Sequence, residues 1–410
     1  MPAQPAGEVP PLDGALPPSA GRGAEHRGLS LYVHVPYCRV RCGYCDFNTY
    51  TAEDLGPGAS RSDYRANLAL ELDLSIRTLA EVGAGDREIA TIFFGGGTPT
   101  LLEAPVLAGV MDDIRARCRL APDVEVTTEA NPDTLTPAYI ETLAKAGFTR
   151  ISLGMQSAVP HVLATLERTH DPAKIPDVSR WIKEAGLELS LDLIYGTPGE
   201  SIDDWRRSLD VALSNEVDHI SAYSLIVEPG TKMGAMVRRG ELPMPDEDDL
   251  ADKYEIADAA MTAAGLSWYE VSNWSTSADT RCEHNLAYWR NADWWGFGPG
   301  AHSHIGGVRF WNAKHPRAWA DRLLAGNSPA VGREVLGETT REIERIMLAA
   351  RIDSELRIDS LPHGSEAAVR MFVSQGLLDP AGAEVGQFRP TLQGRLLADH
   401  MVRVLTEYVD

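Results

Sequence analysis

The sequence His34-Val-Pro-Tyr-Cys-Arg-Val-Arg-Cys-Gly-Tyr-Cys-Asp-Phe47 places Cys38, Cys42 and Cys45 directly after a short apolar run. Three thiolates are one ligand short of the tetrahedral set that structural zinc requires. They can instead hold a [4Fe–4S] cluster whose fourth iron stays open. The alternatives are a metal knuckle that takes His34 as a fourth ligand, or a chance group of thiols.

An open iron suits a small molecule that chelates it, and S-adenosylmethionine (SAM) chelates through its amino and carboxylate groups. The spacing CxxxCxxC, with the aromatic Tyr44 just before the last cysteine, resembles the signature of the radical SAM superfamily. The resemblance implies that the three cysteines bind the cluster and that SAM binds its open iron. Tyr32 precedes the first cysteine by six residues and is expected to border that iron, unless it packs as an ordinary strand residue.

Composition limits the class of protein. The chain has 410 residues, of which 44% are hydrophobic and 24% charged, as in globular proteins of two or three domains. Five cysteines do not make a secreted disulfide framework, and we predict no role for Cys118 and Cys282. No transmembrane run or signal peptide is apparent, so we expect a cytoplasmic location. The net charge of −21 argues against nucleic-acid binding.

Strand-like and helical runs alternate from Leu29 to about Pro229. The expected strands are 29–35, 89–94, 124–129, 150–155, 188–194 and 219–227. The expected helices between them are 64–82, 105–118, 137–145, 173–185 and 203–214. This alternation indicates βαβ units and a parallel sheet. Because six units are too few for a closed eight-stranded barrel, we predict an α/β fold with a partial (β/α)6 barrel, the core of the radical SAM superfamily.

Polar and glycine-rich segments follow the predicted strand ends, where a barrel of this kind carries its active site. The segment Gly95-Gly-Gly-Thr-Pro99 follows the second strand, and it resembles the superfamily segment that holds the SAM amino group, with matches at Gly96, Gly97 and Thr98. The other candidate cofactor-binding residues at or just after strand ends are Glu129, Gln156, Arg168 and Asp192. Arg168 is the best partner for the methionine carboxylate, because guanidinium and carboxylate form bidentate pairs. Taken singly, each of the four could be a surface ion-pair residue.

Composition also suggests where the domains divide. We predict a disordered tail over 1–27, which is rich in Pro, Ala and Gly, and a radical SAM core over 28–240. An aromatic-rich extension follows over 241–331, and a helical or winged-helix-like C-terminal domain over 332–410.

The aromatic-rich extension contains His284-Asn-Leu-Ala-Tyr-Trp289 and seven of the nine tryptophans. Aromatic rings together with imidazoles suit a flat ligand such as a porphyrin, and imidazole is the common axial ligand of haem iron. The candidate haem residues are His284, Asn285, Tyr288 and Trp289. The alternative is a tryptophan core around a satisfied histidine. The glycines of 296–300 predict close backbone approach to the cofactor adenine, with His302 beside it.

Together these motifs resemble the oxygen-independent coproporphyrinogen III oxidase-like family, over all of the chain except residues 1–28. The true oxidase carries a further cysteine two positions after the last cluster cysteine, where this chain has Phe47. Phe47 and the His-Asn-x-x-Tyr-Trp motif are marks of the haem chaperone branch.

The resemblance therefore implies a carrier that binds haem, a [4Fe–4S] cluster and SAM, without the need to turn over a substrate. It would hand haem to acceptor apoproteins, with membrane respiratory proteins as the suggested acceptors, and it would need an electron donor. The alternatives are the radical oxidase itself, against which Phe47 counts, and a radical SAM enzyme acting on RNA, against which the charge counts.

Overall fold

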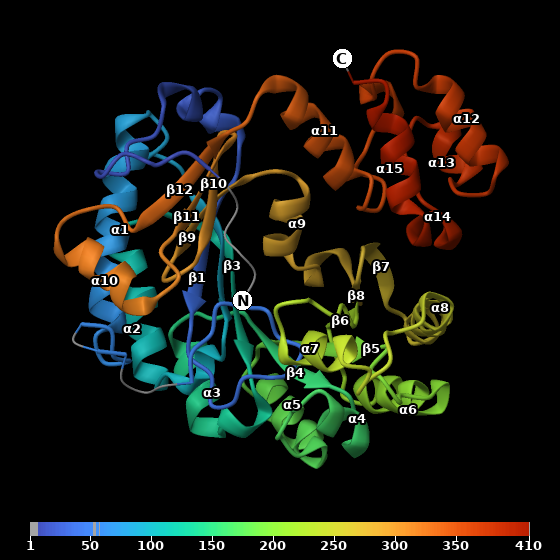
Figure 1. The fold of residues 1–410 in the computed structure, drawn as a ribbon, viewed down its shortest axis with the longest axis horizontal. Coiled ribbons are helices and arrows are strands. Elements are labelled where there is room, and N and C mark those ends of the chain that lie inside the picture. The colour runs from blue at the N-terminus through green and yellow to red at the C-terminus, as the bar shows by residue number, and fades with distance from the viewer. Residues whose placement is uncertain (1–6, 52–54, 57, 410) are drawn as a thin grey trace.

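The computed structural model describes residues 7–51, 55–56 and 58–409. One twelve-stranded sheet runs through it, in the order β12-β11-β10-β9-β1-β2-β3-β4-β5-β6-β8-β7 (Figure 1). Its central six strands are parallel neighbours in chain order. They are β1 (Leu29–Val35), β2 (Ile89–Gly96), β3 (Leu120–Ala130), β4 (Arg150–Gln156), β5 (Glu188–Tyr195) and β6 (His219–Ser224). The predicted partial (β/α)6 barrel is thereby confirmed.

Helices connect these strands and cover the outer face of the curved sheet (Figure 1). They are α1 (Tyr64–Glu81), α2 (Ala104–Arg115), α3 (Pro137–Lys145), α4 (Pro160–Thr165), α5 (Ile175–Glu184) and α6 (Ile202–Leu213). Local sequence sets several helix starts: Thr136 accepts the Tyr139 N–H at the start of α3, and Ser201 with Asp204 forms a capping box on α6. The apolar residues of these helices and of the outward strand faces form one large core.

The predicted aromatic-rich extension is part of the same sheet and core. The strand β9 (Asp293–Phe297) pairs parallel with β1, and β10 (His302–Ile305), β11 (Val308–Asn312) and β12 (Ala330–Val335) continue outward from it. At the other edge β8 (Asn273–Ser275) pairs with β6, and β7 (Ser267–Glu270) pairs with β8. The helices of this region are α8 (Glu247–Ala263), α9 (Glu283–Trp289) and α10 (Pro316–Leu324), and α7 (Lys232–Arg238) precedes it.

The predicted division at residue 240 therefore separates strands that share one sheet. The fully buried tryptophans Trp274 and Trp319 are members of the large core, so they are packing residues.

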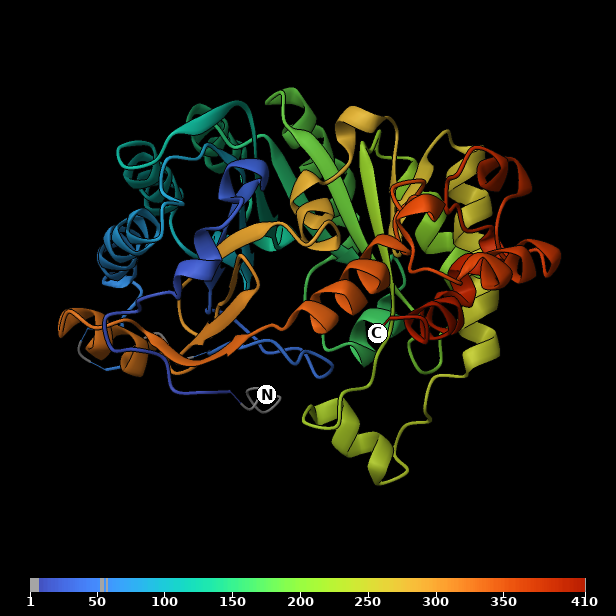
Figure 2. The ribbon, with the colours of Figure 1, turned by 90° about the horizontal axis from the view of Figure 1, so that it is seen from above.

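The C-terminal region forms a helical lobe with a second hydrophobic core of its own. Its helices are α11 (Glu338–Ala349), α12 (Glu366–Ser374), α13 (Pro380–Glu384), α14 (Leu392–Leu396) and α15 (Ala398–Thr406). Both views place this lobe beside α8 (Figures 1 and 2), where Arg395 pairs with Asp258 at 2.7 Å. Residues 338–409 contain no strand that could form the wing of a winged-helix domain. They contain isolated β-bridges instead, such as the one between Leu378 and Pro390.

The prediction of a disordered tail over 1–27 is wrong for residues 7–27, while residues 1–6 lie outside the described part of the chain. Glu8 pairs with Arg333 beside β12, and Ala20 and Ala24 are fully buried against the core. Arg27 forms an ion pair with the buried Asp293 at 3.0 Å. A composition rich in Pro, Ala and Gly favours disorder when no surface accepts the segment, and here β12 and the large core supply that surface.

Deleting residues 1–27 is expected to lower the free energy of unfolding by roughly 2–5 kcal/mol, because the buried Asp293 carboxylate keeps only Arg87 as an ionic partner. Urea unfolding measures the change, with the exposed Arg22→Ala substitution as a control. An unchanged midpoint would mean that the segment packs without stabilising the fold.

Candidate functional site

A cavity of about 710 Å³ opens inside the curve of the sheet, at the carboxyl ends of the parallel strands. Most of the residues predicted from the sequence line it. They are Tyr32, Cys38, Cys42, Tyr44, Cys45, Gly96, Gly97, Thr98, Glu129, Gln156, Arg168, Asp192, His284, Asn285 and Tyr288. Residues from five strands and from α9 are thus brought to one site. The two predicted residues that do not line it are His302 and Trp289.

The three cysteines are free thiols at the mouth of this cavity. The Thr98 hydroxyl donates to the Cys38 sulfur, and the Arg168 guanidinium donates to the Cys42 sulfur. The donor–sulfur distance is 3.9 Å in each case. Burial raises the pKa of Cys38, and it raises the pKa of Cys45 to about 11. Cys38 and Cys45 therefore favour their neutral form in the free protein, and binding of a cluster would release their protons.

His34 cannot serve as a fourth ligand in the conformation observed. Its Nε2 lies 2.9 Å from the Asn48 carbonyl oxygen and its Nδ1 lies 3.1 Å from the Tyr32 hydroxyl, so both nitrogens are engaged. No three His, Cys, Asp or Glu side chains of the described residues converge as ligands of a single ion would. Thiolates that each bind a different iron of one cluster need not converge in that way. With His34 engaged, the three cysteines are one ligand short of a zinc knuckle, whereas three thiolates are a complete protein ligand set for a [4Fe–4S] cluster with one open iron.

The glycine segment at the end of β2 packs directly against the cysteine loop. The Gly97 N–H donates to the Val35 carbonyl and the Thr98 N–H donates to the Tyr37 carbonyl, each at an N–O distance of 2.8 Å. A Cβ on Gly97 would lie 2.5 Å from the Tyr37 oxygen, and Gly96 has a φ of +105°. Side chains at either position would separate the two loops, so only glycine permits this close approach.

The polar residues at the ends of β3 to β5 present both signs of charge. The Glu129 carboxylate accepts the Gly96 N–H at 3.0 Å, and burial followed by repulsion from Asp192 raises its pKa to about 8. Arg168 donates to the Gly154 carbonyl at 3.0 Å, while its buried Nε has no hydrogen-bond partner among the described residues. Gln156 has a left-handed backbone with a φ of 62°, which is strained for a non-glycine residue. Arg168 and Glu129 line the same cavity, so a free guanidinium N–H and a carboxyl group are available to the carboxylate and amino groups of an amino acid such as the methionine part of SAM.

The opposite end of the cavity is polar in a way that the sequence analysis missed. It is lined by Arg150, Ser152, Ser190, His219, Ser221 and Cys282. The Ser190 hydroxyl lies 2.8 Å from His219 Nδ1, and Tyr269 lies 2.8 Å from His219 Nε2. The available signal was the alternation of polar residues within β4, β5 and β6, because alternate residues of a strand point to one face.

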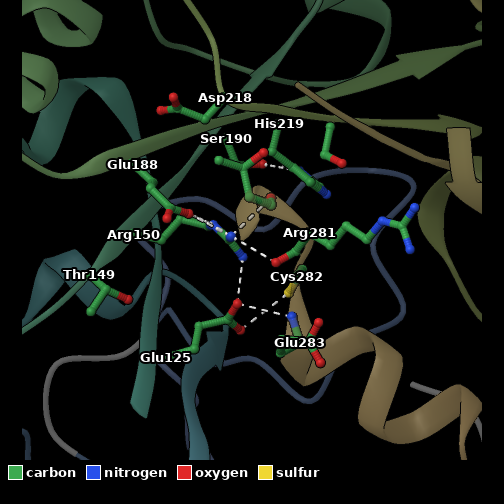
Figure 3. A network of polar contacts seen from close by, with 12 residues as sticks. Glu125, Thr149, Arg150, Glu188, Ser190, Asp218, His219, Arg281, Cys282 and Glu283 are labelled. Atoms are coloured by element: carbon green, nitrogen blue, oxygen red, sulfur yellow. Dashed lines mark hydrogen bonds and ion pairs between the residues drawn. The ribbon is translucent and has the colours of Figure 1, made fainter. Parts of the chain in front are cut away.

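Arg150 joins the barrel wall to the segment that precedes α9 (Figure 3). Its guanidinium forms ion pairs with Glu125 at 2.9 Å and Glu188 at 2.6 Å, and donates to the carbonyls of Thr280 and Arg281 at 3.0 Å. Glu125 in turn accepts the backbone N–H groups of Glu283 and His284, at 2.9 and 3.0 Å. This buried network fixes the start of α9.

The first turn of α9 carries His284 into the inner side of the cavity. The side chain is 1% exposed, and its ring stacks on Phe93 with centroids 5.1 Å apart. Its Nδ1 lies 2.7 Å from the Thr91 hydroxyl and its Nε2 lies 3.0 Å from the Tyr288 hydroxyl. Burial lowers the pKa of His284 to about 3, so the imidazole is neutral near pH 7.

The sequence predicts that Trp289 contacts haem and that His302 lies beside the cofactor adenine, but neither side chain lines the cavity. Trp289 lies five residues after His284, which turns it to another side of α9, where it packs with Leu286 and Ile352. His302 is exposed on β10, and its ring stacks on Trp311 with centroids 5.8 Å apart. Since β10 lies beyond β9 in the sheet, His302 is carried away from the cavity.

Comparison with known proteins is consistent with this architecture. The model of the radical SAM superfamily matches residues 32–212. The heme chaperone HemW of Mycobacterium tuberculosis is 46% identical over 92% of this chain and 94% of its own length. The chain belongs to the HemW family. The HemW of Escherichia coli is 37% identical over 71% of this chain and 75% of its own length.

Radical S-adenosyl methionine domain-containing protein 1, a mitochondrial protein of the mouse, is 35% identical to this chain. The match covers 72% of this chain and 64% of the mouse protein. Among solved structures, the radical SAM coproporphyrinogen III oxidase HemN of Escherichia coli has a TM-score of 0.78. It covers 95% of this chain and 92% of its own, at 22% identity. That likeness confirms the fold class. No helix among the described residues is long and apolar enough to cross a membrane.

Proposed function

We propose that this protein is a haem chaperone that binds a [4Fe–4S] cluster, SAM and haem, and transfers the haem to acceptor apoproteins. The observation that carries the proposal is that His284, Asn285 and Tyr288 line the same cavity as the three cysteines. The names of the HemW relatives agree with it. Membrane respiratory haem proteins are the proposed acceptors, and an electron donor in a reducing compartment such as the cytoplasm would serve the cluster.

Cys38, Cys42 and Cys45 would hold the cluster, and Arg168 with Glu129 would receive the carboxylate and amino ends of SAM. The bound cluster would supply an open iron and one electron. The protein's own part is to orient SAM: Arg168 offers an unpaired buried Nε, while Gly96 ties Glu129 to the loop beside the cysteines. The exposed Phe47 stands where the true oxidase has its further cysteine, which favours the carrier over radical decarboxylation.

The direct test is titration of haem into the anaerobically reconstituted protein, followed by absorbance. Wild type is expected to bind saturably, and His284→Ala is expected to weaken binding by more than about tenfold, because the substitution removes the imidazole that would bind the iron. His302→Ala is the matched control, since His302 lies outside the cavity. Equal affinity in the His284 and His302 variants would refute the assignment of His284, and an absence of saturable binding would refute the haem chaperone.

SAM binding is expected to strengthen as pH rises toward 8. Glu129 has a pKa of about 8 in the free protein, so below that pH its carboxyl group is mostly neutral and attracts the SAM cation weakly. The dissociation constant should fall by up to about tenfold per pH unit between about pH 6 and 8, and then level off. Calorimetry measures this, and Glu129→Gln controls for titration of SAM itself. Parallel pH profiles of the two proteins would contradict the role of Glu129.

A further inference from the structure

A chain of hydroxyl groups leads to His284 from the inner wall of the barrel. Ser30 on β1 and Thr91 on β2 are both buried. The Thr91 hydroxyl donates to the Ser30 hydroxyl oxygen at a distance of 2.9 Å. A threonine hydroxyl has one hydrogen, and in this chain that hydrogen is used toward Ser30. The Thr91 oxygen therefore faces His284 Nδ1, at 2.7 Å, with a lone pair. Nδ1 must then carry the imidazole proton.

The proton on Nδ1 leaves Nε2 with the lone pair that a metal requires. This lone pair is covered by Tyr288, whose hydroxyl lies 3.0 Å from Nε2. Tyr288 stands four residues after His284 and so lies on the same side of α9, with the two rings edge to face at 4.9 Å. Both side chains line the cavity. The Tyr288 ring also packs edge to face on Trp294 at 4.8 Å, which supports it from the other side.

We propose that Ser30 and Thr91 are positioning residues that hold His284 in the Nδ1-protonated tautomer, and that Tyr288 is a displaceable cap on Nε2 that competes with the haem iron. The proposal rests on the proposed function. On binding, the hydrogen bond from the Tyr288 hydroxyl to Nε2 breaks and an iron–Nε2 bond forms. The Tyr288 proton stays on its oxygen, and no group is oxidised or reduced.

This arrangement suits a protein that must release its haem. A neutral hydroxyl behind Nδ1 is a weaker acceptor than a carboxylate, so it makes the imidazole a weaker donor to iron. The Tyr288 hydroxyl can bond to Nε2 again as soon as the iron leaves. Both features lower the affinity of the carrier in comparison with a protein that retains haem.

The first experiment measures haem affinity by absorbance in Tyr288→Phe. Removal of the cap is expected to tighten binding by about three- to tenfold, the equivalent of one hydrogen bond that no longer has to be broken. The phenylalanine ring keeps the packing on His284 and Trp294, so the fold is preserved. Unchanged or weaker binding would overturn the cap.

The second experiment observes the tautomer without haem. In protein labelled with 15N-histidine, long-range 1H–15N correlation spectra are expected to give the Nδ1–H pattern for His284, assigned by its loss in His284→Gln. Ser30→Ala frees the Thr91 hydrogen for Nδ1 and should shift His284 toward the Nε2–H form. Thr91→Ser should retain the wild-type pattern.

An Nε2–H pattern in the wild type, or no shift in Ser30→Ala, would overturn the positioning role even if haem binds. In contrast, a wild type with the Nδ1–H pattern that binds no haem would refute the proposed function and leave the tautomer assignment standing. The two failures are therefore distinguishable.

Discussion

Cys42→Ala is expected to abolish the [4Fe–4S] cluster, and with it the binding of SAM. A cluster with one open iron has only three protein ligands, so the loss of one leaves two thiolates for four irons. Cys42 also lies against Arg168, the proposed carboxylate partner, so the substitution disturbs both halves of the SAM site. Iron and sulfide content after anaerobic reconstitution, together with visible absorbance, measures the effect.

Cys118→Ala is the matched control, because Cys118 lies outside the cavity. It should retain wild-type iron and sulfide. Wild-type iron and sulfide in Cys42→Ala would mean that the motif does not ligate the cluster, and the argument for SAM at this site would fall with it.

Arg150→Ala is expected to lower the free energy of unfolding by roughly 3 kcal/mol, since it leaves the largely buried Glu125 without its ionic partner. This expected loss is at the low end of the range for a buried pair. The reason is that Glu188, the other ionic partner of Arg150, is partly exposed and can be hydrated once the arginine is removed. Haem affinity should fall as well, because Arg150 and Glu125 together hold the segment that begins α9 (Figure 3).

Urea unfolding of the cluster-free protein gives the stability change, and haem titration gives the second effect. Arg117→Ala, which removes a surface pair with Asp73, is the control and should change stability by no more than about 1 kcal/mol. If Arg150→Ala unfolds at the same urea concentration as this control, the network does not stabilise the fold. If Arg150→Ala is destabilised but keeps full haem affinity, the network does not position α9 for haem binding.

The sequence predicted the barrel because its signals are local. The apolar run at 29–35 and the helices between the strands follow patterns that neighbouring residues enforce, and β1 was found at the predicted bounds. The cysteine spacing and the glycines at 95–97 are equally local, since each needs only a short loop. The candidate residues at strand ends were found together because parallel strands end on one side of a sheet.

The missed residues depend on contacts between distant segments. Arg150 and His219 lie at the starts of strands, where the sequence alone does not separate a barrel interior from an ordinary core. Trp289 shares a motif with His284, yet one helix directs them to different sides. The segment over 7–27 has the composition of a disordered chain, and it is ordered by a surface formed from residues far along the sequence.

The sequence by itself determined the cluster motif, the order of the six parallel strands and of the helices between them, and hence the family. The tertiary structure alone decided that α9 carries His284 to the cavity and that the hydroxyls of Thr91 and Tyr288 lie within hydrogen-bond distance of its two nitrogens. The physical reason is range. Periodicity and ligand spacing act over a few residues, whereas the partners of a buried imidazole come from strands and helices that only the folded sheet brings together.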